Sequence, residues 1–204
     1  MIVPNSAEAR LLAAKTIRSG GLVAFRTDTF YGLGADPLDS GAIKHIRELK
    51  GREEQKPILL LISALECVDK FFTHRPEQFD EVVRKHWPGP LTLIGPARSE
   101  LPVELTAGTA TIGLRLPAGE DIQALVQACG GALTATSANL AGESPSRTAK
   151  DVARYFPKGV NLIIDGGETR VTEPSTVLDL SGAKPLLVRE GMIKKAELED
   201  LFRL

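Results

Sequence analysis

Three groups of polar residues in this 204-residue chain could do chemistry, and the first is a cluster of cations. Lys50, Arg52 and Lys56 lie close together around a glycine, which lets the backbone turn tightly about a ligand. Such cations could hold a phosphate. Lys and Arg also favour the last turn of a helix, where Glu53 and Glu54 could pair with them, so a solvated helix end is the alternative.

The second group follows an apolar strand pattern directly. Thr136, Ser137 and Asn139 precede a loop that contains Ser144 and Ser146. Small hydroxyl and amide side chains can hold a phosphate, a ribose or a carboxylate through neutral hydrogen bonds. The same residue types are common in capped turns for local reasons, so an ordinary turn is the alternative here.

The third group consists of single polar residues within apolar strand patterns, namely Thr111, Arg115, Ser175 and Arg189. An arginine is costly to bury without a partner, so Arg115 could bind an anionic ligand. A strand end with a nearby Asp or Glu is the alternative. All three groups lie at the ends of apolar runs, where open α/β sheets usually gather their ligand-binding loops.

The elements that must position these residues alternate between strand and helix patterns. Apolar runs predict strands over residues 22–25, 58–62, 91–94, 111–116, 132–136, 161–165, 175–180 and 185–190. Helices are predicted after Ser6, from about 40 to 50, after Ser63 in a capping box with Glu66, from 76 to about 87, over 121–129, after Thr148 and from 194 onward. Residues 26–37 read as irregular. The late strands lack crossover helices, which predicts a mixed sheet in one α/β (α+β) domain over residues 1–204.

Composition and missing motifs exclude several classes of protein. Lys and Arg total 25 against 26 Asp and Glu, so the chain lacks the excess of positive charge that would indicate a nucleic-acid binder. Cys67 and Cys129 have no metal-site spacing, and the three histidines form no metal motif. The motifs GxxxxGK, GxGxxG and GxSxG are absent. Without a signal segment or a membrane-length apolar run, we expect a cytoplasmic protein with no membrane association.

Seven segments follow one another between roughly Gly20 and Gly191, namely TDTFYGLGAD, KGR, PGPLTLI, TIGLRLP, TSANLAGESPS, PSTVLDL and LVREG. In this order they resemble the YrdC family of threonylcarbamoyl-adenylate synthases. The resemblance implies an open, twisted α/β sheet with a concave, positively charged face. It also implies a reaction in which L-threonine, bicarbonate and ATP, the last with Mg²⁺, give threonylcarbamoyl-adenylate and pyrophosphate. No tightly bound cofactor is implied.

The resemblance also implies roles for individual residues. The residues that it places in the catalytic core are Lys50, Arg52, Ser137 and Asn139. Those that it places at ATP are Arg52, Lys56, Thr111, Ser137, Ser144, Ser146 and Arg189. Those that it places at threonine are Thr29, Arg115 and Ser175, with Arg115 on the carboxylate.

Two positions depart from the family pattern. Arg26 and Glu53 stand where the family usually has proline, and the loss of the fixed φ at position 26 affects the geometry of the adjoining loop. Longer family members carry a further C-terminal domain. The resemblance therefore leaves open what shields the reactive intermediate from water.

Alternatives to the synthase belong to other functional classes. The same concave face could serve a nonenzymatic module that binds double-stranded RNA or tRNA during RNA or ribosome maturation. Thr29, Arg115, Ser137 and Asn139 favour the enzyme, because a phosphate backbone does not require a small amino-acid pocket. Carbamoyl transfer in hydrogenase maturation uses a related domain inside a much longer chain. As a synthase, the protein would pass its product to proteins that transfer the threonylcarbamoyl group to tRNA.

Overall fold

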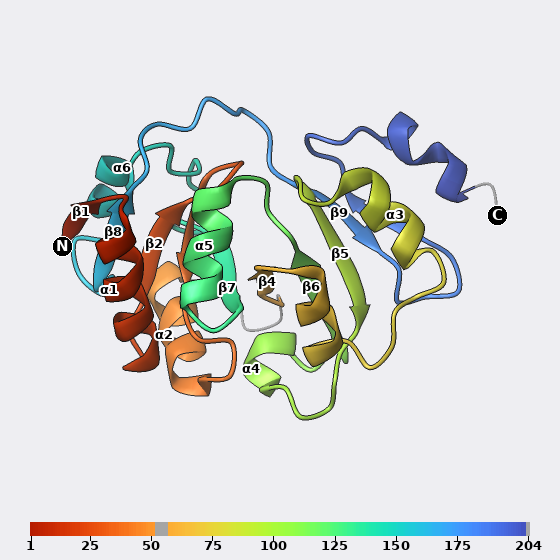
Figure 1. Cartoon of the computed structure of the whole chain (residues 1–204), viewed down its shortest axis with the longest axis horizontal. Helices are drawn as coiled ribbons and strands as arrows, with labels where there is room; N and C mark the ends of the chain where they lie inside the picture. The colour runs from red at the N-terminus through yellow and green to blue at the C-terminus, as the bar shows by residue number, and fades with distance from the viewer. Residues whose placement is uncertain (52–56, 203–204) are drawn as a thin grey trace.

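A ten-stranded mixed sheet organises the computed structural model, which describes residues 1–51 and 57–202. The strand order is β1-β8-β2-β3-β7-β4-β6-β5-β9-β10 (Figure 1). The strands are β1 (Ile2–Pro4), β2 (Val23–Arg26), β3 (Tyr31–Gly34), β4 (Leu59–Ile62), β5 (Leu91–Pro96), β6 (Thr111–Arg115), β7 (Ala132–Ser137), β8 (Leu162–Asp165), β9 (Thr176–Asp179) and β10 (Leu186–Arg189). Neighbouring strands form both parallel and antiparallel pairs, which confirms the predicted mixed sheet.

The helices begin where the sequence offers side-chain caps. Ser6 accepts from the Ala9 amide, and Thr148 forms a reciprocal capping box with Asp151, as predicted. The helices are α1 (Ala7–Arg18), α2 (Ser40–Lys50), α3 (Phe79–His86), α4 (Val103–Thr106), α5 (Glu120–Ala128) and α6 (Ala149–Tyr155), with 3₁₀ helices η1 (Leu65–Lys70) and η2 (Lys195–Phe202). None of the helices within the described ranges has both the length and the apolar character that crossing a bilayer requires.

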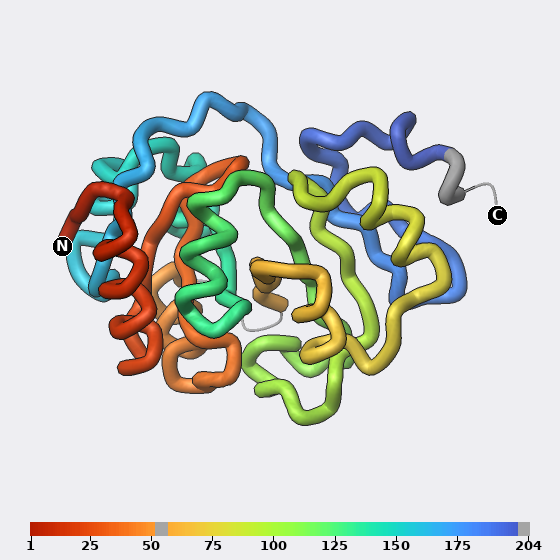
Figure 2. The backbone as a smooth tube through the Cα atoms, viewed as in Figure 1, coloured from red at the N-terminus to blue at the C-terminus, as the bar shows by residue number. Residues whose placement is uncertain are grey.

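The helices cover the sheet in separate clusters. Side chains of α2, η1 and α3 pack with Leu60, Ile112 and Leu114 in the largest core cluster. Helices α1 and α5 pack on β2, β7 and β8, and α6 packs beside β3. In Figure 1 the segment after β8 crosses to β9 along one edge of the molecule, and Figure 2 shows β1 and η2 at opposite ends. The helices leave part of one sheet face uncovered.

Two sequence predictions about elements are wrong. Residues 31–34 form β3 although the segment reads as irregular, and Ser63 caps no helix. The Ser63 hydroxyl instead donates to Gln127 Oε1 at 2.7 Å, a partner from a distant helix, and η1 begins after Ala64 without a side-chain cap. Long-range partners therefore override both local patterns.

Candidate active site

A cavity of about 630 Å³ lies on the uncovered sheet face, a volume usual for small-molecule sites. Its floor is built by alternate residues of adjacent strands, because side chains of a strand point to opposite faces in turn. Thus Thr111, Gly113 and Arg115 of β6 line the cavity, while Ile112 and Leu114 between them are buried in the core. The contributing strands run without interruption from β3 to β10 in the sheet order.

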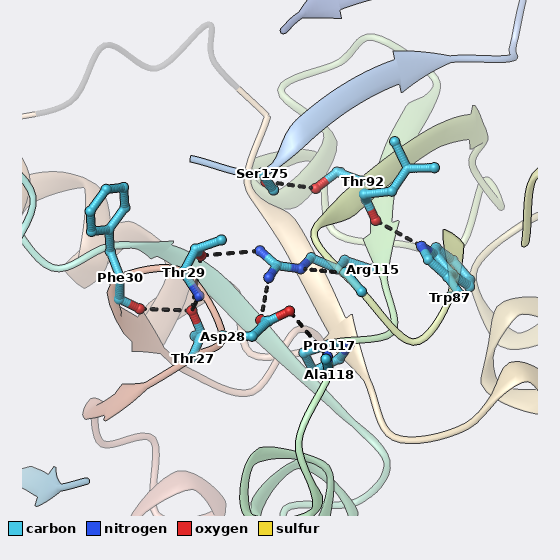
Figure 3. A network of polar contacts seen from close by, with 12 residues as sticks. Thr27, Asp28, Thr29, Phe30, Trp87, Thr92, Arg115, Pro117, Ala118 and Ser175 are labelled. Atoms are coloured by element: carbon cyan, nitrogen blue, oxygen red, sulfur yellow. Dashed lines mark hydrogen bonds and ion pairs between the residues drawn. The ribbon is translucent and has the colours of Figure 1, made fainter. Parts of the chain in front are cut away.

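Arg115 is held on the cavity wall by three different partners (Figure 3). Its Nε donates to the Gly89 carbonyl at 3.1 Å, one terminal nitrogen donates to Thr29 Oγ1 at 3.3 Å, and the other forms an ion pair with Asp28. The second oxygen of Asp28 accepts from the Ala118 amide at 3.1 Å. Only 4% of Arg115 is exposed, so these contacts fix the orientation of the guanidinium before any ligand binds.

A second guanidinium, that of Arg189, faces the same cavity. It donates to the Ser175 carbonyl at 3.1 and 2.8 Å and to the Ser175 hydroxyl at 3.2 Å, and that hydroxyl also lies 3.3 Å from Thr92 Oγ1. Its hydrogen-bond partners in the described part of the chain are uncharged, whereas Arg115 also pairs with the carboxylate of Asp28. The pKa of Arg189 is lowered, first by desolvation and then by the positive charge of Arg115. A bound anion would relieve this repulsion.

Lys50 joins the first two polar groups of the sequence. Lys50 is the last residue of α2 and is followed by Gly51, which has the left-handed conformation. The Lys50 ammonium group donates to the backbone carbonyls of Ser137 and Asn139, the latter at 2.7 Å. Lys50 is 5% exposed and does not line the cavity, whereas Ser137 does. The lysine therefore holds the loop that presents Ser137.

Asn139 is also buried beside this lysine. Its amide nitrogen donates to the carbonyls of Leu140 at 2.9 Å and Glu143 at 2.7 Å. Its Oδ1 atom is buried and has no hydrogen-bond partner among residues 1–51 and 57–202. Such an unsatisfied acceptor is unusual in a folded protein and leaves this side chain able to accept one more hydrogen bond.

The predicted site residues other than Lys50 and Asn139 divide into three sets. The structure brings six of them together as cavity lining, namely Thr29, Thr111, Arg115, Ser137, Ser175 and Arg189. Ser146 is buried and donates to the Ala138 carbonyl, and Ser144 is exposed on the loop beside it; neither lines the cavity. Arg52, Lys56 and the departure at Glu53 lie outside the described residues. The roles of all these residues stay predictions.

Arg26, the other departure, lies outside the cavity lining. It ends β2, is exposed, and donates to the Gly166 carbonyl at 3.1 Å. The adjacent Tyr31 hydroxyl donates to the Gly167 carbonyl at 2.8 Å and accepts from the Gly166 amide at 3.1 Å, and burial raises its pKa to about 12. Arg26 therefore helps to fix the turn after β8.

Sequence reasoning missed Asp28 and Thr27, which contact the predicted residues Arg115 and Thr29. Asp28 carries the ion pair with Arg115, and Thr27 accepts from the Thr29 amide at 3.0 Å. The signal was the segment Thr27-Asp28-Thr29, in which three polar residues follow a buried strand. It could not identify the partner of Asp28, which lies 87 positions away.

Comparison with known proteins connects this geometry to a family. The sequence model of the Sua5_yciO_yrdC family, described as "Telomere recombination", matches residues 15–191. The chain belongs to this family. Its cavity therefore lies in a Sua5/YciO/YrdC domain, as the motif order predicted.

Two relatives and one solved structure show how far the similarity extends. Threonylcarbamoyl-AMP synthase of Pyrococcus abyssi is 40% identical over 94% of this chain and 56% of its own length. The protein of that name from Thiobacillus denitrificans is 36% identical over 83% of this chain and 90% of its own. A crystal structure of P. abyssi Sua5 complexed with L-threonine matches 98% of this chain and 60% of that one, at 37% identity and a TM-score of 0.94. The chain thus spans little more than half of the Pyrococcus relative.

Proposed function

We propose that this chain is a threonylcarbamoyl-AMP synthase, a nucleotidyltransferase that uses L-threonine, bicarbonate and ATP. The observation that carries the proposal is the pair of guanidinium groups, Arg115 and Arg189, that face one cavity together with the four predicted hydroxyl side chains of Thr29, Thr111, Ser137 and Ser175. The carboxylate of an amino acid and the phosphates of a nucleotide would give each of the two cations an anionic partner, whereas a single anion would leave one cation without one. Relatives that carry the synthase name support the same assignment.

The reaction has two steps, and positioning dominates both. The amino nitrogen of threonine bonds to the carbon of bicarbonate with loss of water and gives an N-carboxylate. One oxygen of that carboxylate then attacks the α-phosphorus of ATP, and the bond to pyrophosphate breaks. Such transfers depend on alignment and on neutralising charge at the phosphate oxygens. We assign threonine to Thr29, Arg115 and Ser175, and ATP to the side of Ser137, Thr111 and Arg189.

Mg²⁺ belongs to this proposal as part of the ATP substrate, where it would neutralise phosphate charge. No group of three or more metal-binding side chains is found within residues 1–51 and 57–202. The carboxylate next to the cavity, Asp28, is already engaged by Arg115 and the Ala118 amide. We therefore assign no protein ligand to the ion. The product would pass, in the cytoplasm, to proteins that modify tRNA.

Pyrophosphate release tests the proposal directly. The purified chain is given ATP, Mg²⁺ and bicarbonate, with and without L-threonine. Release should require both threonine and bicarbonate, and Arg189→Ala should lower kcat/KM for ATP by about tenfold or more, the usual effect of losing a charge-assisted hydrogen bond. Arg154→Ala is the matched control, because Arg154 is exposed on α6 and pairs only with Asp151 among described carboxylates.

The result that would count against the synthase is equally specific. A folded chain that binds ATP but releases no pyrophosphate with both co-substrates present is not this enzyme. Binding of double-stranded RNA or tRNA by that same preparation would support the nonenzymatic alternative instead.

A further inference from the structure

The hydroxyl groups of Thr27 and Thr29 form a chain whose hydrogen positions can be worked out. Thr27 Oγ1 lies 2.7 Å from the Phe30 carbonyl oxygen, which can only accept, so the single Thr27 hydroxyl proton must point there (Figure 3). Thr27 Oγ1 also accepts from the Thr29 amide at 3.0 Å. It therefore has no proton left for its third neighbour, Thr29 Oγ1, at 3.0 Å.

The proton between the two hydroxyls must then come from Thr29. Thr29 Oγ1 donates to Thr27 and accepts from Arg115 at 3.3 Å, which uses its only proton and one of its two lone pairs. Both threonines line the cavity and are buried, with 9% and 6% exposed. While its proton is donated to Thr27, Thr29 can act toward a ligand only as an acceptor.

A second part of the cavity wall, at Ser175, has a different polarity. Ser175 Oγ accepts from Arg189 at 3.2 Å, and its own proton can go either to Thr92 or to a ligand oxygen. Thr29 and Ser175 thus distinguish a ligand group that donates from one that accepts. An amino acid with a hydroxyl side chain carries both kinds of group.

We propose that Thr27 is a positioning residue that keeps Thr29 an acceptor, and that Thr29 thereby selects the amino nitrogen of the amino-acid substrate. This inference rests on the proposed function and specifies how its substrate is oriented. With the carboxylate on the unused N–H groups of Arg115, the α-amino group falls beside the Thr29 oxygen that Arg115 also contacts. An amine that donates one N–H to Thr29 keeps its lone pair for the bond to the bicarbonate carbon.

The ratio of the affinities for two ligands measures this selection. Titration calorimetry compares L-threonine with (R)-3-hydroxybutanoate, which is L-threonine without its amino group. In Thr27→Val the Thr29 proton loses its acceptor and can turn toward the cavity, so the preference for L-threonine should fall by about fivefold or more, the effect of one hydrogen bond. Thr27→Ser keeps the hydroxyl and should restore the preference, and ATP affinity should stay unchanged in both variants.

Each outcome of this experiment decides a different point. An unchanged preference in a folded Thr27→Val variant overturns the role of Thr27 while the proposed function stands. A wild-type chain that binds ATP but not L-threonine contradicts the proposed function itself. If Thr27→Val does not fold, Thr29→Val removes the acceptor with the same side-chain shape, and a retained preference in that variant likewise overturns the inference.

Discussion

Arg115 shows how one buried charge is prepared for a ligand. Its Nε and both terminal nitrogens each have a partner, Gly89, Thr29 and Asp28, and within residues 1–51 and 57–202 one N–H on each terminal nitrogen has no partner. The planar fork of a guanidinium can hold these partners and a carboxylate at once. A lysine at this position would have three donors from one point and could not span the same set.

Arg115→Lys should therefore raise the KM for L-threonine by about ten- to hundredfold, the loss of one or two charge-assisted hydrogen bonds. The KM for ATP should change much less, because lysine keeps the positive charge at position 115 and ATP is assigned to Ser137, Thr111 and Arg189. Steady-state pyrophosphate release at varied concentrations of each substrate makes the comparison. Equal losses for the two substrates would contradict the assignment of Arg115 to threonine.

At this scale the sequence predicts which residue types meet but not how they pair. Six of the predicted side chains line one cavity, because alternate residues of neighbouring strands share a face. For Arg115 the sequence indicates only that a nearby Asp or Glu is the alternative to an anionic ligand, and it does not identify Asp28. Lys50, predicted in the catalytic core, contacts the backbone of the Ser137 loop, and its catalytic role stays a prediction. Neither contact has a signal in local spacing, since each joins residues more than 80 positions apart.

The elements follow their local patterns except where tertiary contacts set the conformation. Strand β3 was missed because Gly32 and Gly34 lower the strand propensity of its four residues. In the structure a side chain at Gly34 would lie 2.6 Å from the Phe25 ring and 3.0 Å from the Thr134 carbonyl oxygen. Glycine is needed there for close packing, and this reason is visible only once β2 and β7 are in place.

The turn between α4 and β6 carries backbone strain. Ala107 and Ala110 have φ of 53° and 55°, a region that costs a residue with a side chain about 1–2 kcal/mol. The Ala110 carbonyl accepts from the Ala97 amide at 2.9 Å, and the next residue, Thr111, begins β6 on the cavity wall. The strained turn therefore sets where Thr111 enters the site.

Ala110→Gly should relieve this strain and raise the free energy of unfolding by about 0.5–1 kcal/mol, after the greater entropy of glycine in the unfolded chain is subtracted. Ala153→Gly is the matched control: it lies inside α6 with ordinary helical geometry and should lower stability by about 1 kcal/mol. Urea denaturation of both variants measures the two signs. A destabilised Ala110→Gly variant would show that the turn is not strained.

The cavity extends along most of the sheet order, since its lining begins on β3 and ends on the edge strand β10. The residues assigned to threonine come from both halves of the sheet: Thr29 precedes β3 in the half from β1 to β7, and Arg115 and Ser175 belong to the half from β4 to β10. Bound threonine would therefore contact both halves. Trp87, the single tryptophan, reports on one half: it is buried against Phe79, with ring centroids 5.8 Å apart, and donates to the Leu91 carbonyl at 2.7 Å. Far-ultraviolet circular dichroism, in contrast, reports on all helices and strands together.

L-Threonine at a hundredfold excess over its Kd should stabilise the protein by about 2.7 kcal/mol, because it binds only the folded state. In a chain of this length that corresponds to a rise in Tm of about 5–10 °C. Trp87 fluorescence and circular dichroism should shift together, since the ligand links strands from both halves, and Arg115→Lys should shift less at the same threonine concentration. If fluorescence alone moved, the two halves would unfold separately, and the cavity would not couple them.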